Sequence, residues 1–416
     1  MFNSLLQKIP DQNIFRRGKF QLLSSLIEKT TFLFLYLYIA KNFSRHEFGL
    51  VVLSFTFLNI LSSFFDLGLP AYCQREAARV ETMGNKLAGL LKIKVILLIP
   101  FLLMGLIIRR EDLSYSSLMI MAGLYVYISS VNDLLVKYLY GKNKFGLAFR
   151  LLFYSRLIFY FSILIALILK IRYDLLIAVL TISSIINLIF LLNQFSIKSA
   201  SVSGDLDYYD LKNILKSSLP LWLGSIFVWC YNKLDILLIQ VLLGPASVAY
   251  YAAAYSIYQF PQILFGLVLS PLYTDLSVKN GKRDSYSYKE IIKKNSIMFF
   301  ITFSLVLIYL ISPGRIIAII FGSGYSNTGP VLRILSLALI PLFLNNITGI
   351  ILNSAGREKL QMAGTFTGLI INLLLNLFLL QKISILAAAI ATVAAETLVF
   401  VIHLHFIIKK KLVAYK

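Results

Sequence analysis

The sequence predicts an all-α integral membrane protein with twelve transmembrane helices arranged in two six-helix lobes. Twelve apolar stretches, each long enough to cross a bilayer, fill the 416 residues almost end to end. A spanning helix needs about 20 apolar residues to cover roughly 30 Å of hydrocarbon. The composition agrees, because 58% of the residues are hydrophobic, only 14% are charged, and the mean hydropathy is +0.80. The chain therefore has no soluble part in which an ordinary active site could be built.

The apolar stretches form two sets of six, with a hydrophilic segment between them. The first six run over Gly18–Ala40, Phe48–Pro70, Leu87–Ile108, Tyr115–Tyr140, Leu147–Leu169 and Tyr173–Phe195. The second six run over Leu215–Leu243, Val248–Tyr273, Ser296–Phe321, Val331–Asn353, Met362–Leu380 and Ile383–Ile408. We therefore divide the chain into an N-terminal lobe (residues 1–195), a cytoplasmic linker (196–212) and a C-terminal lobe (213–416).

The two lobes show a weak internal repeat. The spacing Phe-x-Leu-x-Leu at residues 65–69 recurs at residues 265–269. The offset spans six helices, an even number, so both lobes enter the membrane from the same side. Such a parallel repeat is related by a pseudo-two-fold axis along the membrane normal, and transporters built this way place their substrate between the halves.

The basic balance of the chain predicts its orientation. A net charge of +21 would suggest nucleic-acid binding in a soluble protein. In a membrane protein, however, Lys and Arg collect in the cytoplasmic loops. With both termini inside, the inner loops and helix ends carry more than three times as many basic residues as the outer ones. The charge thus predicts a multi-pass topology with both termini cytoplasmic, and no nucleic-acid partner.

Several basic residues lie within the apolar windows, where a charge costs on the order of 3 kcal/mol or more and often marks function. Lys29, Arg156 and Lys233 have no carboxylate three or four residues away on their own helix. Arg333 lies close to the predicted outer surface. These four residues could form ion pairs across helices, or they could line a cationic cavity for an anionic head group. Three deep cations on three different helices favour the cavity.

Three carboxylates also lie within the windows and are candidates for coupling transport to an ion gradient. Glu28, Asp235 and Glu396 would each lie in a low-dielectric environment, where a carboxylate readily gains a proton. The coupling ion could be H⁺ or Na⁺. Asp66 and Asp133, near the inner interface, are interpreted as structural, capping a helix or pairing with Arg75 or Lys137.

Other chemistries have no support in the sequence. It contains no GxGxxG, GxxxxGK[ST], HExxH or GxSxG motif, and its two cysteines and three histidines have no metal-ligand spacing. We therefore expect neither an enzyme nor a bound cofactor or metal.

Four blocks of sequence, in the right order, resemble the polysaccharide-transporter family of Wzx-type flippases. That family lies in the superfamily that includes MATE exporters and lipid II flippases. The resemblance covers about residues 18–408, and Ser44 departs from it where the family usually has Gly. The blocks comprise Ala40–Gly49 with Asp66–Leu69 and Arg75–Glu76; Leu215–Pro220 with Tyr231–Asp235, Leu243–Gly244 and Tyr250–Ala254; Ile319–Tyr325 with Ala355–Gly356; and Ala387–Thr392.

The resemblance implies transport of an undecaprenyl-pyrophosphate-linked oligosaccharide, an O-antigen or capsule repeat unit, across the bacterial plasma (inner) membrane. It implies a basic central cavity, alternating access and a driving ion gradient. Membrane lipids, a polysaccharide polymerase and a chain-length regulator are the implied partners. Two alternatives stay open: a MATE-like exporter of small organic molecules, and a membrane-embedded polymerase or glycosyltransferase. The short outer connection at residues 321–330 disfavours the second.

Overall fold

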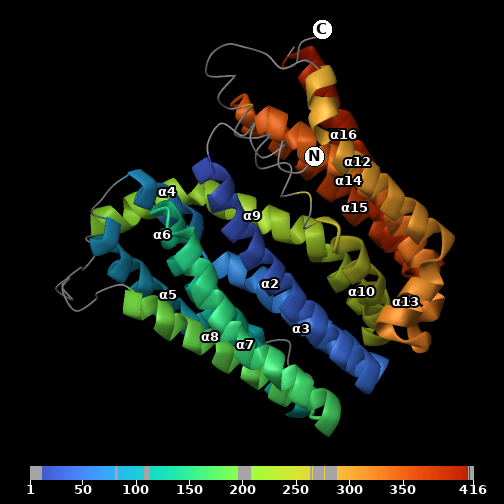
Figure 1. Ribbon diagram of the computed structural model, residues 1–416, viewed down its shortest axis with the longest axis horizontal. Coiled ribbons are helices and arrows are strands. Elements are labelled where there is room, and N and C mark those ends of the chain that lie inside the picture. The colour runs from blue at the N-terminus through green and yellow to red at the C-terminus, as the bar shows by residue number, and fades with distance from the viewer. Residues whose placement is uncertain are drawn as a thin grey trace. The chain divides into compact units, whose positions relative to one another are not determined.

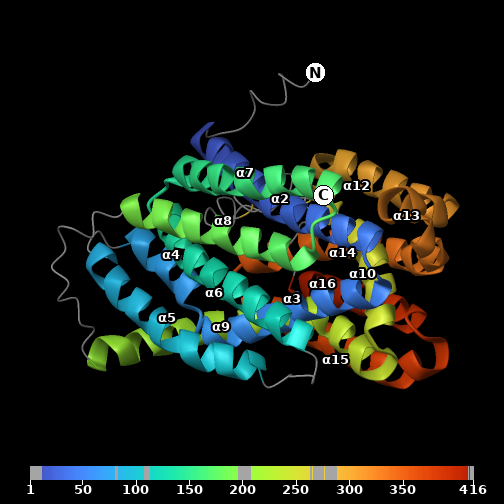
Figure 2. The same ribbon diagram turned by 90° about the horizontal axis from the view of Figure 1, so that it is seen from below.

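The computed structural model describes residues 12–79, 83–106, 113–194, 208–262, 265, 276, 288–410 and 412, and this part of the chain is helical almost throughout (Figures 1 and 2). The helices of the first half are α2 (Gln12–Asn42), α3 (Arg45–Phe65), α4 (Leu69–Arg79), α5 (Met83–Leu106), α6 (Leu113–Gly141), α7 (Phe145–Leu169) and α8 (Tyr173–Gln194). Those of the second half are α9 (Tyr208–Leu243), α10 (Pro245–Gln259), α12 (Tyr288–Ile311), α13 (Pro313–Phe321), the short 3₁₀ helix η1 (Ser323–Thr328), α14 (Gly329–Ser354), α15 (Glu358–Ile383) and α16 (Leu386–Lys409).

Most of these helices are long and apolar enough to cross a membrane. Ten of them qualify singly within the described ranges, and the bent pair α12–α13 passes the same test when its two helices are taken together. The eighth predicted window, Val248–Tyr273, is described over α10, at residues 260–262 and at residue 265, and the rest of it lies outside the described residues. Large apolar side chains are exposed on several spans, among them Ile168 (80%) and Phe300 (70%), as expected of surfaces that contact lipid.

The second predicted window, Phe48–Pro70, is wrong about where the helix ends. Helix α3 stops at Phe65, and Leu67 and Gly68 take left-handed backbone conformations before α4 begins. Gly68 is required here for space as well as for its φ of +68°. A Cβ atom at Gly68 would lie 2.6 Å from the Ser218 carbonyl oxygen of α9. The indole Nε1 of Trp222 holds the same contact by donating to the carbonyls of Ser63 and Phe64 at 3.0 Å.

At the other end of α3, the residue that departs from the family pattern has a clear local role. Ser44 is the N-cap of α3 and forms a capping box with Glu47, since its hydroxyl accepts from the Glu47 N–H while the Glu47 carboxylate accepts from the Ser44 N–H. Serine is among the preferred N-cap residues. The departure therefore gives a well-defined start to α3.

The ninth predicted window, Ser296–Phe321, is likewise not one straight helix. Helices α12 and α13 meet at Ser312 with a bend of 89°. The break follows from Pro313, which has no N–H to donate and suits the first position of a new helix.

Packing divides the chain into two compact units, residues 23–233 and residues 234–416 together with 1–22. In the first unit α6 is the central helix, packed against α3, α4, α5, α7 and α8. In the second unit α14 contacts α10, α12, α13, α15 and α16. Both central helices are the fourth span of their half, as an internal repeat predicts. The division falls within α9; the predicted linker lies mostly outside the described residues, so the boundaries set there stay a prediction.

Candidate functional site

Arg156 is the most distinctive charged group of the first unit. It lies on α7, and only 4% of its surface is exposed. Its two terminal nitrogens donate to hydroxyl groups, to Ser183 Oγ at 3.3 Å, Ser184 Oγ at 3.1 Å and the Tyr125 hydroxyl at 3.3 Å. The guanidinium also lies 5.6 Å from the centre of the Tyr125 ring. Within the described ranges no carboxylate lies at salt-bridge distance from Arg156, so its direct partners are neutral.

Hydrogen bonds connect the helices that carry the three hydroxyl groups around Arg156, which we name the hydroxyl cradle. The Ser183 hydroxyl donates to the carbonyl of Ser155 at 2.6 Å, which ties α8 to α7. The Asn132 amide donates to the carbonyl of Ser184 at 2.9 Å, which ties α6 to α8. The Nε of Arg156 is buried and has no hydrogen-bond partner among the described residues. The cation is therefore fixed in position, with one donor left over.

Glu28 and Lys29 lie on α2, and the side chains of both are exposed. The Glu28 carboxylate interacts electrostatically with Arg156, Lys137 and Asp133, and also with Lys29. Of these two neighbouring residues, it is Glu28 whose carboxylate interacts electrostatically with Arg156. Asp133 interacts electrostatically with Lys137, and no salt bridge between the two is found among the described residues, so their expected pairing stays a prediction.

Lys94 is a buried charge that sequence reasoning missed. It lies on α5 with no exposed surface, forms an ion pair with Asp66 and donates to Ser130 Oγ at 2.6 Å. Asp66 therefore pairs with Lys94 and not, as expected, with Arg75, whose carboxylate partner is its neighbour Glu76. The signal was present, because Lys94 interrupts an apolar window in the same way as Lys29.

Asp235 and Glu396 lie in one buried polar cluster of the second unit, which comprises Asp235, Tyr251, Tyr255, Asn345 and Glu396. Asp235 accepts hydrogen bonds from the Tyr251 hydroxyl and from the Ile236 N–H. Glu396 accepts from the Asn345 amide at 2.6 Å. Tyr255 interacts electrostatically with both carboxylates. Two of the three predicted coupling residues thus lie in one unit and both act electrostatically on Tyr255, whereas Glu28 lies in the other unit.

Lys233 and Arg333 belong neither to the hydroxyl cradle nor to the buried polar cluster as defined above. Lys233, on α9, is partly exposed and is the last residue of the first unit. Arg333 is exposed at the start of α14, in the second unit, where it lines a pocket together with Arg315. A single cavity lined by Lys29, Arg156, Lys233 and Arg333 therefore stays a prediction. Among the described residues, no three His, Cys, Asp or Glu side chains are grouped as a metal site.

Comparison with known proteins gives the family. The profile of the polysaccharide biosynthesis protein family matches residues 17–274, and the MatE profile matches residues 220–378. The probable low-salt glycan biosynthesis flippase Agl15 of Haloferax volcanii is 25% identical over 203 residues, which is 47% of this chain and 41% of that protein. The chain thus aligns with less than half the length of this curated relative.

Two solved structures share the fold. An inward-facing MATE family transporter of the MOP superfamily matches with a TM-score of 0.72 at 14% identity, over 91% of this chain and 93% of that one. The lipid II flippase MurJ in an inward closed conformation matches with a TM-score of 0.70 at 16% identity, over 92% and 86%. These likenesses confirm the predicted all-α, twelve-helix, two-lobe membrane fold. The family profile over residues 17–274 covers more than half of the chain, which therefore belongs to the polysaccharide biosynthesis protein family.

Proposed function

We propose that this protein moves an undecaprenyl-pyrophosphate-linked oligosaccharide, a repeat unit of a surface polysaccharide, from the inner to the outer leaflet of the plasma membrane. The proposal goes beyond the family's general role as a flippase or transporter in substrate, direction and membrane. On this view the protein catalyses no chemical step and works by alternating access, with both termini in the cytoplasm.

The observation that carries the proposal is Arg156 in its hydroxyl cradle. A pyrophosphate that crosses a low-dielectric region needs a cation that is not already neutralised by a direct carboxylate partner. Arg156 is such a cation, and its guanidinium geometry suits phosphate oxygens. The named relative, a probable glycan flippase, supports the same substrate class. An exporter of organic cations has less use for a buried arginine.

The buried polar cluster of the second unit supports ion coupling. Asp235 and Glu396 are 4% and 5% exposed, and their identified partners include neutral hydroxyl, amide and backbone groups. Carboxylates in such surroundings can bind a proton or a small cation as part of a transport cycle. We propose that H⁺ or Na⁺ binding at this cluster drives the conformational change.

The decisive experiment measures transport of a lipid-linked oligosaccharide in proteoliposomes, with Lys233→Ala, Lys29→Ala and Arg156→Gln beside the wild type. Loss of one desolvated charged contact weakens binding of the pyrophosphate by about 1.5–3 kcal/mol, or roughly 10- to 150-fold. Lys233→Arg should retain more transport than Lys233→Ala because it keeps the charge. Lys382→Gln, an exposed charge at the end of α15, is the matched control.

Two results would contradict the proposal. Normal transport by all three charge-removing variants would exclude a cationic site for the pyrophosphate. Efflux of an organic cation by the wild type, with no movement of the lipid-linked oligosaccharide, would favour the MATE-like alternative. In cells, removal of the gene should leave the lipid-linked oligosaccharide on the inner leaflet.

A further inference from the structure

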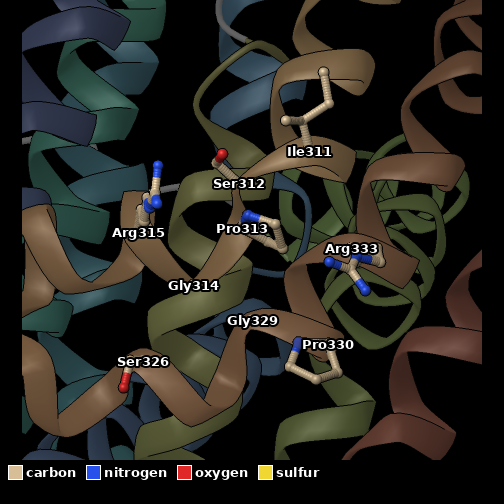
Figure 3. A pocket seen from close by; sticks show the side chains of 9 residues that line it. All are labelled: Ile311, Ser312, Pro313, Gly314, Arg315, Ser326, Gly329, Pro330 and Arg333. Carbon is tan, nitrogen blue, oxygen red and sulfur yellow. The ribbon is translucent and has the colours of Figure 1, made fainter.

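The pocket that contains Arg333 has a volume of about 590 Å³ and opens at the bend between α12 and α13. Figure 3 shows it between the starts of α13 and α14, with the ring of Pro313 between the side chains of Arg315 and Arg333 in this view. Its lining comprises Ile311, Ser312, Pro313, Gly314, Arg315, Ser326, Gly329, Pro330 and Arg333. Both arginines are exposed, and neither forms an ion pair within the described part of the chain.

No negative charge of the surrounding sequence balances the two guanidinium groups. The chain contains no Asp or Glu between Glu290 and Glu358, and the pocket lining contains none either. The first turns of α13 and α14 also carry no acidic residue. Two arginines in one concave site with no carboxylate form a receptor for an anion, and paired arginines favour phosphate.

The two helix starts add to the positive potential of the pocket. Neither the Ser312 nor the Thr328 side chain caps its helix. No N-cap side chain therefore accepts from the first-turn N–H groups of either helix, and the helix dipoles direct positive charge to the same place. The two starts touch: a Cβ atom at Gly329 would lie 3.0 Å from the backbone nitrogen of Gly314.

The surroundings of the pocket point to an amphiphile rather than to a soluble anion. Helix α13 turns by 89° from the spanning helix α12, so a membrane-normal α12 leaves α13 in the plane of the interface. Pro313, Ile317 and Phe321 of α13 are buried in the protein. Ile311 and Ile319, each 77% exposed, lie four residues before and four residues after Arg315 and offer apolar surface near its charge. Apolar surface beside cations is the arrangement that binds a lipid head group and its chains.

We propose that this pocket binds the phosphate of a membrane amphiphile at the head-group level of the predicted outer leaflet. The phosphate contacts Arg315 and Arg333, while the acyl or prenyl chains lie along Ile311 and Ile319. A phospholipid of the leaflet and a polyprenyl pyrophosphate both supply this chemistry. The site is built by the second unit alone and does not depend on the transport cycle proposed above.

The test is binding of defined lipids to the purified, delipidated full-length protein, read by native mass spectrometry. The probes are phosphatidylglycerol, undecaprenyl pyrophosphate and, as a phosphate-free control, diacylglycerol. The double variant R315Q/R333Q removes both guanidinium groups. Its matched control, R357Q/K382Q, removes two exposed charges of the same unit that lie outside the pocket.

We expect R315Q/R333Q to weaken binding of at least one phosphate probe by about tenfold or more, since each lost charge-assisted hydrogen bond is worth that much. The affinity of the variant R315K/R333K for that probe should lie between the affinities of the wild type and of R315Q/R333Q. Lysine keeps the positive charge but loses the two parallel N–H donors of the guanidinium group. A loss confined to phosphatidylglycerol identifies a leaflet lipid, and one confined to undecaprenyl pyrophosphate identifies the polyprenyl carrier.

The proposal is overturned if neither phosphate probe distinguishes R315Q/R333Q from R357Q/K382Q, or if diacylglycerol binding falls equally. Because no transport is measured, this outcome is separate from failure of the proposed flippase function.

Discussion

Lys94 shows at the scale of one residue how the first unit tolerates charge. Its ammonium has no exposed surface, and its polar partners are Asp66, the C-cap residue of α3, and Ser130 of α6. A buried ion pair contributes little net stability to the fold. Removing one partner, however, is strongly destabilising because the other charge is left buried without a counter-charge. Lys94 therefore joins three helices through one side chain.

We expect Lys94→Met to lower the free energy of unfolding by about 3 kcal/mol, because Asp66 loses its cation. The double variant Asp66→Asn/Lys94→Met should recover most of that loss. Lys92→Met, at an exposed position two residues away, is the control. Thermal unfolding in detergent, followed by intrinsic fluorescence, provides the measurement. Equal melting temperatures for Lys94→Met and Lys92→Met would contradict the ion pair.

Cys73, on α4 outside the spans, gives a second prediction at this scale. Burial raises the pKa of the Cys73 thiol to about 12, and the nearby Asp133 charge adds to the shift. Since the thiolate is the reactive form, maleimide labelling of Cys73 should stay very slow from pH 7 to pH 9. Labelling should become rapid once detergent denatures the protein. Fast labelling of the native Cys230→Ser variant would show that Cys73 is accessible.

At the scale of the element, the break between α3 and α4 depends on Gly68, where an alanine would be strongly destabilising. Gly68 has a φ of +68°, and its Cα faces the backbone of α9 at Ser218 and Trp222. Gly68→Ala should cost about 2–4 kcal/mol, because it combines a strained backbone with a clash.

Gly224→Ala is the matched control for Gly68→Ala, since it lies on α9 with open space where a Cβ would go. In a helix interior this change should stabilise the protein by about 0.5–1 kcal/mol. The two substitutions are chemically identical and should shift the melting temperature in opposite directions. A shift in the same direction for both would mean that the packing at Gly68 is looser than described.

The positions of the helices can be predicted from the sequence, whereas the bends and the partners of the buried charges cannot. The bilayer sets the length of a span, so hydropathy alone located the helices. The bends at Gly68 and Ser312 were missed because both lie within continuous apolar windows, where hydropathy does not register a change of direction. The hydroxyl cradle of Arg156 depends on which helices pack together, and periodicity along α7 carries no information about Tyr125 of α6 or Ser183 of α8. Sequence reasoning identified Arg156 as a deep cation and left its partners open.

At the scale of the whole molecule, the orientation in the membrane is the first property to test. The distribution of basic residues places both termini and residues 196–212 in the cytoplasm. A reporter fused at Ser203 should therefore show cytoplasmic activity, and one fused at Ser326 should show activity on the outer side. The same fusions decide whether the pocket with Arg315 and Arg333 faces the outer leaflet. Reversed readings would invert both the topology and the proposed direction of transport.

The hydroxyl cradle of Arg156 should lower the thermal stability of the protein, and this effect can be measured in the absence of any substrate. A guanidinium whose direct partners are neutral gives up hydration without the full return of an ion pair, even with Glu28 in its field. We expect Arg156→Met, of similar length, to raise the melting temperature by a few degrees, about what 1 kcal/mol produces, while transport is lost. A lower melting temperature would instead make Arg156 a brace between α6, α7 and α8. If Arg156→Met has the higher melting temperature, natural selection has retained the less stable sequence at this position. The protein then carries a lower thermal stability in exchange for a buried positive charge.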